Sequence, residues 1–150
     1  MARAPDLHEA YLLIRDVALA VRLFQQDNVH CAGVTFTQFT ILDHIARAHG
    51  ELPLADLHGL LQVEKSTTTR LLGPLVDKGL IARAQGRDAR AVLLVLTTAG
   101  RSTHDAFWRC LAANIGRALE GIDVATFEQV ARSLRLFIHA VARGAHGTCG

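Results

Sequence analysis

Apolar residues recur at helical spacing near both ends of the chain. In residues 7–26, and again after residue 123, they advance by three or four positions (Leu7, Tyr11, Ile14, Ala18 and Val21; Phe127, Val130, Leu134, Phe137 and Val141). That spacing puts an apolar seam on one face of each helix. A small domain cannot fully cover two such seams, so we predict that the terminal helices pack together and form a dimer.

The middle of the chain predicts three shorter helices. Thr35 and Gln38 fit a capping box, so a helix should start there and end near Gly50. A short helix is expected over residues 54–61, and another over residues 65–78 after a three-residue gap. Two helices joined by so tight a turn are typical of a helix-turn-helix, with the second as recognition helix.

A strand pair is expected after this second helix. Gly79 suits the left-handed cap that ends a helix, and apolar runs at residues 80–82 and 92–96 flank a polar loop. Helix, strand, basic hairpin tip and strand form the plan of a winged helix. A long helix capped by Thr97 or Thr98 should follow.

Proline inside the recognition helix predicts a distortion. Gly73 and Pro74 lie in its second half, where a proline removes one backbone hydrogen bond and clashes with the preceding turn. We therefore expect a kink after Arg70 or a reoriented second half of the helix.

Positive charge gathers on this same part of the chain. Between Glu64 and Arg101 there are seven lysines and arginines and three acidic residues, a net charge of +4, whereas the whole chain carries +2. In a nearly neutral protein, positive charge that is concentrated on one element is typical of a surface that binds phosphate groups.

Composition and motifs argue against several other classes of protein. The 150 residues fit one domain, there is no run of 18 apolar residues, and the N-terminus does not resemble a signal peptide, which predicts a cytoplasmic protein without a membrane partner. Three widely spaced cysteines favour reduced thiols over a disulfide framework. The histidines show no metal-ligand spacing, and there is no glycine-rich phosphate loop or G-x-S-x-G motif, so we predict no metal, no cofactor and no enzyme.

Four short motifs, in this order and spacing, carry a resemblance. They are S-T-x-x-R-L from Ser66, K-G-L-I-x-R from Lys78, D-x-R from Asp88 and L-T-x-x-G from Leu96. With T-x-x-Q from Thr35 they resemble the MarR family of bacterial transcription regulators over about residues 8–143.

The resemblance implies a fold, a partner and a division of the chain. The fold would be mainly α with a small β-wing, a winged helix-turn-helix lobe plus dimerisation helices from both termini. We expect an N-terminal dimerisation helix and linker in residues 1–34, the lobe in residues 35–100, and C-terminal dimerisation helices and tail in residues 101–150. The homodimer would bind a double-stranded, pseudo-palindromic operator.

The expected DNA contacts lie in the recognition helix and the wing. Hydroxyl and cationic side chains at the start of a recognition helix reach phosphates and base edges, and Arg70 suits a bidentate contact with guanine. The resemblance places the D-x-R arginine near the minor groove and lets the aspartate hold the wing. The full set is Lys65, Ser66, Thr67, Thr68, Thr69, Arg70, Arg87, Asp88 and Arg90. The family often has a basic residue where this chain has Ala89.

The signal is a separate question. The resemblance implies a repressor that a small organic ligand releases at the junction between lobe and dimerisation helices. That junction should include His30, Cys31 and Cys110, so a thiol sensor of oxidant, electrophile or soft metal is the alternative. Against it, free cysteines are most often small buried hydrophobes. A third interpretation is a helical interaction or catalytic domain that does not bind DNA.

Overall fold

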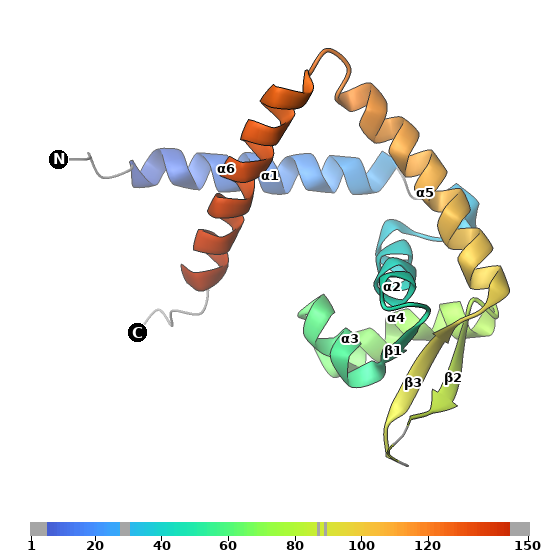
Figure 1. Cartoon of the computed structure of the whole chain (residues 1–150). Helices are drawn as coiled ribbons and strands as arrows, with labels where there is room; N and C mark the ends of the chain where they lie inside the picture. The colour runs from blue at the N-terminus through green and yellow to red at the C-terminus, as the bar shows by residue number, and fades with distance from the viewer. Residues whose placement is uncertain (1–5, 28–30, 87, 89, 145–150) are drawn as a thin grey trace. The chain divides into compact units, whose positions relative to one another are not determined.

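The computed structural model describes residues 6–27, 31–86, 88 and 90–144 (Figure 1). Its helices and strands are α1 (Leu7–Asp27), the 3₁₀ helix η1 (Cys31–Gly33), α2 (Phe36–Arg47), β1 (Glu51–Pro53), α3 (Leu54–Leu61), α4 (Lys65–Asp77), β2 (Ile81–Gln85), β3 (Val92–Leu96), α5 (Thr98–Ala118) and α6 (Val124–Gly144). The chain divides into two compact units between Ala112 and Ala113. A mainly helical chain with a small sheet is the predicted fold class.

The sheet has three antiparallel strands in the order β1-β3-β2. β2 and β3 pair from Ile81 opposite Leu96 to Gln85 opposite Val92, and this hairpin extends away from the helices as a wing (Figure 1). β1 pairs with the other edge of β3, with Leu52 opposite Leu94. The sequence predicted β2 and β3 only, because three residues are too few to show an alternating pattern.

The core of the first unit lies between α2, α3, α4, the sheet and the first half of α5. Its fully buried apolar side chains are Ile41, Leu42, Ile45, Leu57, Leu72, Leu75, Leu94 and Phe107. The ring of Phe107 stacks on Phe39, with centroids 4.4 Å apart. Aliphatic side chains therefore fill most of the core, and ring contacts such as this one join α5 to α2.

Three local signals in the sequence are confirmed. Thr35 and Gln38 form the capping box of α2: the Thr35 hydroxyl accepts from the Gln38 N–H, and the Gln38 side chain accepts from the Thr35 N–H. Gly79, with φ 67°, follows α4 in the left-handed region. The Thr97 hydroxyl accepts from the Gly100 N–H and so caps α5.

Gly100 explains the end of the L-T-x-x-G motif. A Cβ atom at this position would lie 2.0 Å from the carbonyl oxygen of Leu80. The first turn of α5 therefore packs directly on the backbone that enters β2, and only glycine leaves room for this contact. The Thr97 hydroxyl donates to the Gly79 carbonyl at 2.7 Å, so the same motif makes a second contact with the backbone between α4 and β2.

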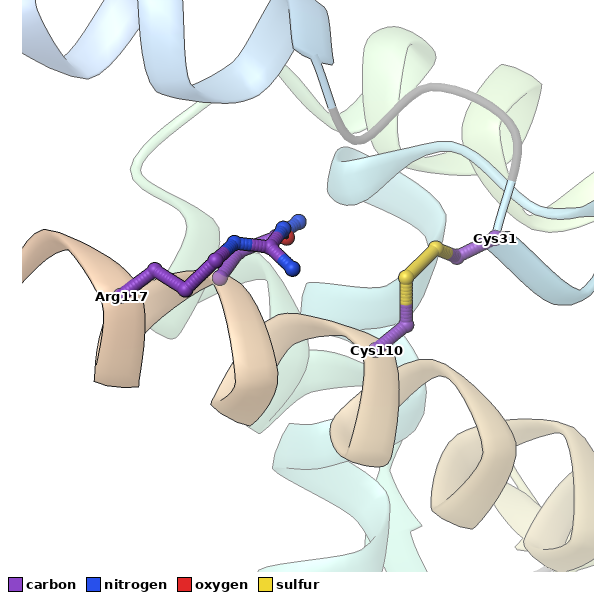
Figure 2. The surroundings of a disulfide bond; sticks show 4 residues. Cys31, Cys110 and Arg117 are labelled. Atoms are coloured by element: carbon purple, nitrogen blue, oxygen red, sulfur yellow. Dashed lines mark hydrogen bonds between the residues drawn. A yellow bond between two sulfur atoms is a disulfide. The ribbon is translucent and has the colours of Figure 1, made fainter.

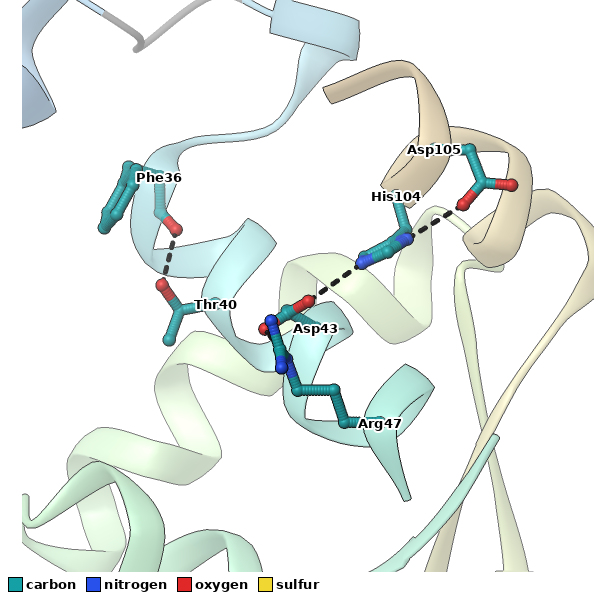
Figure 3. A network of polar contacts seen from close by, with 6 residues as sticks. All are labelled: Phe36, Thr40, Asp43, Arg47, His104 and Asp105. Carbon is teal, nitrogen blue, oxygen red and sulfur yellow. Dashed lines mark hydrogen bonds and ion pairs between the residues drawn. The ribbon is translucent and has the colours of Figure 1, made fainter. Parts of the chain in front are cut away.

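A polar network joins α2 and α5 (Figure 3). The His104 ring lies between two carboxylates, with Nε2 3.1 Å from Asp43 and Nδ1 3.0 Å from Asp105. Arg47 donates to the other oxygen of Asp43 at 2.7 Å. Partial burial acts to raise the pKa of Asp43, but the hydrogen bonds from His104 and Arg47 outweigh it and hold the pKa below the ordinary 3.8.

The two terminal helices keep their apolar seams exposed. No residue of α6, which is described throughout, is buried, and the same holds for residues 7–22 of α1, whose side chains are described. The seam residues of α6 include Phe127, 46% exposed, and Val130, 56% exposed. Within the described residues, no helix is long and apolar enough to cross a membrane.

Candidate nucleic-acid interface

The helix-turn-helix consists of α3 and α4. Gln62 takes the left-handed conformation, with φ 51° and ψ 36°, and ends α3, so that only residues 62–64 separate the two helices. Leu57 of α3 and Leu72 and Leu75 of α4 are fully buried. Both helices are thus anchored by their apolar sides, and the opposite side of α4 faces solvent.

The solvent side of α4 carries cations and hydroxyls. Lys65, Ser66, Thr69 and Arg70 are exposed, and Thr67 is partly exposed. The Thr69 hydroxyl donates to the Lys65 carbonyl oxygen at 3.1 Å, which leaves its oxygen able to accept from another donor. We call these five residues the basic face of α4.

The start of α4 has no side-chain cap among the described residues. Glu64 occupies the N-cap position, and its side chain makes no capping hydrogen bond. The backbone N–H groups of the first turn therefore have no partner within the helix, and such groups favour an anionic oxygen. This end of α4 can contribute to a phosphate contact alongside Lys65.

Thr68 corrects one prediction. Its side chain is 0% exposed, and its hydroxyl has no hydrogen-bond partner among the described residues. Thr68, Leu72 and Leu75 are spaced by four and three residues, so they share the buried stripe of α4. Thr68 therefore belongs to the core and cannot reach DNA from this position. Its spacing from Leu72 and Leu75 indicates a buried position, but a polar residue on this helix was expected to be exposed.

Pro74 does not break the recognition helix. α4 runs as a single helix from Lys65 to Asp77 with Pro74 inside it. Pro74 is exposed, whereas Leu72 and Leu75 on either side are buried. The carbonyl of Arg70, which loses its backbone donor to the proline ring, belongs to the exposed side where water can hydrogen-bond it. Packing of the two leucines holds the helix together across the expected break.

The wing tip is held by Asp88. Its carboxylate accepts from the Arg90 N–H at 3.1 Å, and its carbonyl accepts from the Ala91 N–H at 2.8 Å. A further bond of 2.8 Å, from the Gly86 N–H to the Ala91 carbonyl, closes the hairpin. Asp88 thus shapes the turn through short local bonds and leaves the exposed Arg90 side chain free to project from it.

Two further arginines belong to the wing sequence. Arg87, one of the predicted contacts, lies outside the described residues. Arg83 of β2 is exposed, and was not among the predicted contacts although it lies in the positively charged window. Its position on a wing strand is the signal that marks it as an additional cation on this surface.

Comparison with known proteins finds a family that is similar to the middle of the chain. The sequence model of the MarR family matches residues 32–91. That segment runs from η1 through the helix-turn-helix to the wing. The match covers 60 of the 150 residues, so this segment of the chain is similar to the MarR family. No curated protein matches the sequence.

Solved structures of MarR-family regulators share the fold over almost the whole chain. A mutant MarR from E. coli complexed with operator DNA has a TM-score of 0.65 and 25% identity, covering 87% of this chain and 99% of the other. A regulator from Streptomyces coelicolor in complex with DNA has a TM-score of 0.76 and 17% identity, covering 99% and 94%. An organohalide-sensing regulator in the 2,4-dichlorophenol-bound form has a TM-score of 0.74 and 15% identity, covering 93% and 88%.

The predicted sensor residues give a third correction. Cys31 and Cys110 are joined by a disulfide, so the expectation of reduced thiols is wrong for these two (Figure 2). Cys31 begins η1 and Cys110 lies on α5, 79 residues away. The sequence placed both in one region but could not pair them. His30 and Cys149 lie outside the described residues.

Proposed function

We propose that this chain is a MarR-family transcription regulator that binds double-stranded DNA as a homodimer. The observation that carries the proposal is the basic face of α4, which lies opposite a buried stripe on the second helix of a helix-turn-helix. A helix presented in this way fits the major groove. We assign the protein no enzymatic activity, and operator DNA as partner would place it in the cytoplasm.

Different residues of this surface would do different work. The Arg70 guanidinium can donate two parallel hydrogen bonds to guanine O6 and N7, which gives base specificity. Lys65 and the hydroxyls of Ser66 and Thr69 are suited to phosphate and base-edge contacts. Arg90, held by the Asp88 turn, would enter or border the minor groove as the wing follows the backbone.

The exposed seams support a dimer. Tyr11 and Ile14 of α1 are 57% and 41% exposed, and no residue of the α6 seam is buried. Apolar faces of this extent need a covering surface, and a second copy of the chain supplies identical seams. A two-fold dimer would present two basic faces to a pseudo-palindromic operator, and occupation of that operator would repress transcription.

The signal that releases the operator has two candidates. A small organic ligand is implied by the family, and the 2,4-dichlorophenol-bound relative supports this possibility. A thiol sensor is supported by the Cys31–Cys110 disulfide of this chain.

Substitution of Arg70 tests the proposed function. DNA from immediately upstream of the protein's own gene is titrated with wild-type protein and with Arg70→Ala, across a series of salt concentrations. We expect Arg70→Ala to cost about 1–3 kcal/mol of specific binding free energy. Arg109→Ala, an exposed arginine of α5 outside the basic face, is the matched control and should bind as wild type does.

Two results would contradict the proposed function. One is that the wild-type protein fails to bind any duplex at low salt. The other is that its affinity does not fall with rising salt, because phosphate contacts release counterions and must give a salt dependence.

A further inference from the structure

The two lysines of the chain lie at the two ends of α4. Fourteen of the sixteen lysines and arginines are arginines, and the remaining two are Lys65 and Lys78. Lys65 is the first residue of α4, and Lys78 is its C-cap. An arginine side chain stays charged, whereas a lysine amine can be acylated and then loses its charge. The helix proposed to read DNA therefore begins and ends at the only side-chain amines of the protein.

The two amines have different surroundings. The Lys78 ammonium group donates to the Gly33 carbonyl oxygen at 2.7 Å. Lys65 is exposed, and its side chain has neither a hydrogen-bond partner nor an ion-pair partner among the described residues. An amine reacts through its nitrogen lone pair, which must turn toward the electrophilic carbon. Lys78 must give up its contact with Gly33 to do so, whereas Lys65 can react without breaking any contact.

Lys65 also occupies the position where loss of charge matters most. It belongs to the basic face of α4, beside the backbone N–H groups that Glu64 leaves uncapped. This step rests on the proposed function, in which Lys65 contacts a DNA phosphate. An acylated Lys65 is neutral and longer, so it would release no counterion on binding and would add bulk where the helix approaches the DNA backbone.

The start of α4 favours one class of acyl donor. Free N–H groups at a helix start favour anionic oxygens, and an acyl phosphate carries such oxygens next to its reactive carbonyl carbon. A donor whose phosphate part lies against these groups has its carbonyl carbon near the Lys65 side chain. The neighbouring residues thus select both the amine and the type of reagent.

We propose that Lys65 is acylated by acyl phosphates and that this modification weakens operator binding. The neutral Nζ attacks the carbonyl carbon of the acyl phosphate and a C–N bond forms. The C–O bond to phosphate breaks, and inorganic phosphate leaves with the bonding electron pair. The nitrogen then gives a proton to water, which leaves an uncharged amide. The reaction involves no oxidation or reduction.

Peptide mapping tests which amine reacts. The full chain is treated with acetyl phosphate, and mass spectrometry follows acetylation of Lys65 and Lys78 with time. We expect Lys65 to react about tenfold faster, because Lys78 must first lose a hydrogen bond made by a charged donor. Equal rates, or faster acetylation of Lys78, would overturn the proposal.

DNA binding tests the consequence. DNA from immediately upstream of the protein's own gene is titrated with treated and untreated protein across a series of salt concentrations. Loss of one phosphate contact from each subunit of a dimer should weaken binding at least about tenfold at low salt. It should also reduce the slope of the logarithm of affinity against the logarithm of salt concentration by about two. Equal affinity and an unchanged slope would overturn the proposal.

Two matched variants assign the effect to one amine. Lys65→Arg has a charge that acetyl phosphate does not remove, so its affinity should be the same before and after treatment. Lys78→Arg keeps Lys65 and should lose affinity on treatment as the wild type does. A loss in Lys65→Arg, or no loss in Lys78→Arg, would overturn the proposal. If untreated wild type binds no duplex at low salt, the proposed function itself fails, so the two failures are distinguishable.

Discussion

The helix-turn-helix lobe and the α6 helix use the same kind of residue in opposite ways. Phe107, on the half of α5 that completes the core of this lobe, is 0% exposed and stacks on Phe39, whereas Phe127 at the start of α6 is 46% exposed. Both belong to regular apolar stripes in the sequence. The lobe completes its core within one chain, and α6 does not bury any residue of its seam.

The difference separates two sources of stability. An apolar stripe that is buried within its own chain stabilises the folded state at every protein concentration. A stripe that is buried against a second copy stabilises the folded state by mass action, so its effect depends on protein concentration. The lobe can therefore hold its basic face in place by itself. The separation between two such faces would be set by the terminal helices, which we propose to be covered in the dimer.

Removing one phenylalanine from each region should have the largest effect. Phe107→Ala leaves a cavity in a filled core and should lower the free energy of unfolding by about 3–5 kcal/mol at all protein concentrations. Phe127→Ala should give a smaller loss that depends on protein concentration. Denaturant titrations at two concentrations measure both. A concentration-independent loss at Phe127 would contradict the distinction between the two regions.

A charge on the α6 seam should break the dimer without unfolding the lobe. Leu134→Asp puts a carboxylate where a second copy would cover the seam, and should weaken dimerisation by about 2–3 kcal/mol. Leu136→Asp is the matched control, because Leu136 lies off the seam and is 71% exposed, against 40% for Leu134. Sedimentation of both variants measures the effect, and equal dissociation in the two would argue against the seam as interface.

Acid should weaken the lobe slightly through Asp43. Because its pKa is lower in the folded protein than the ordinary 3.8, Asp43 contributes stability above that pH, and the contribution is lost as pH falls through the lowered value. The size should stay below about 1 kcal/mol, since solvent reaches this carboxyl and screens it. The stability of wild type relative to Asp43→Asn should fall as the pH drops below 3.8. A pH-independent difference between the two proteins would contradict this.

Sequence predicted most of the features that depend on neighbours along the chain. The capping box at Thr35, the left-handed Gly79 and the helix-turn-helix all follow from short-range spacing, and all are found. Non-local features were missed. β1 exists only because it pairs with β3, and the two cysteines are 79 residues apart, so neither pattern appears within one stretch of sequence.

Within the candidate site, two predictions that rested on residue type alone were wrong. Thr68 is polar, but its position on the stripe with Leu72 and Leu75 puts it in the core. Pro74 usually breaks a helix, yet packing on both sides of it keeps α4 continuous. In both cases tertiary packing of the helix outweighs the preference of a single residue.

The spacing of half-sites tests the central claim most directly. The bound segment upstream of the gene is located by footprinting, and affinity is measured for this duplex and for one with five base pairs inserted between the half-sites. Two lobes fixed in one dimer require half-sites on the same face of the DNA, so we predict that the insertion weakens binding at least about tenfold. Equal affinity for the two duplexes would show that the lobes bind independently and would contradict the account.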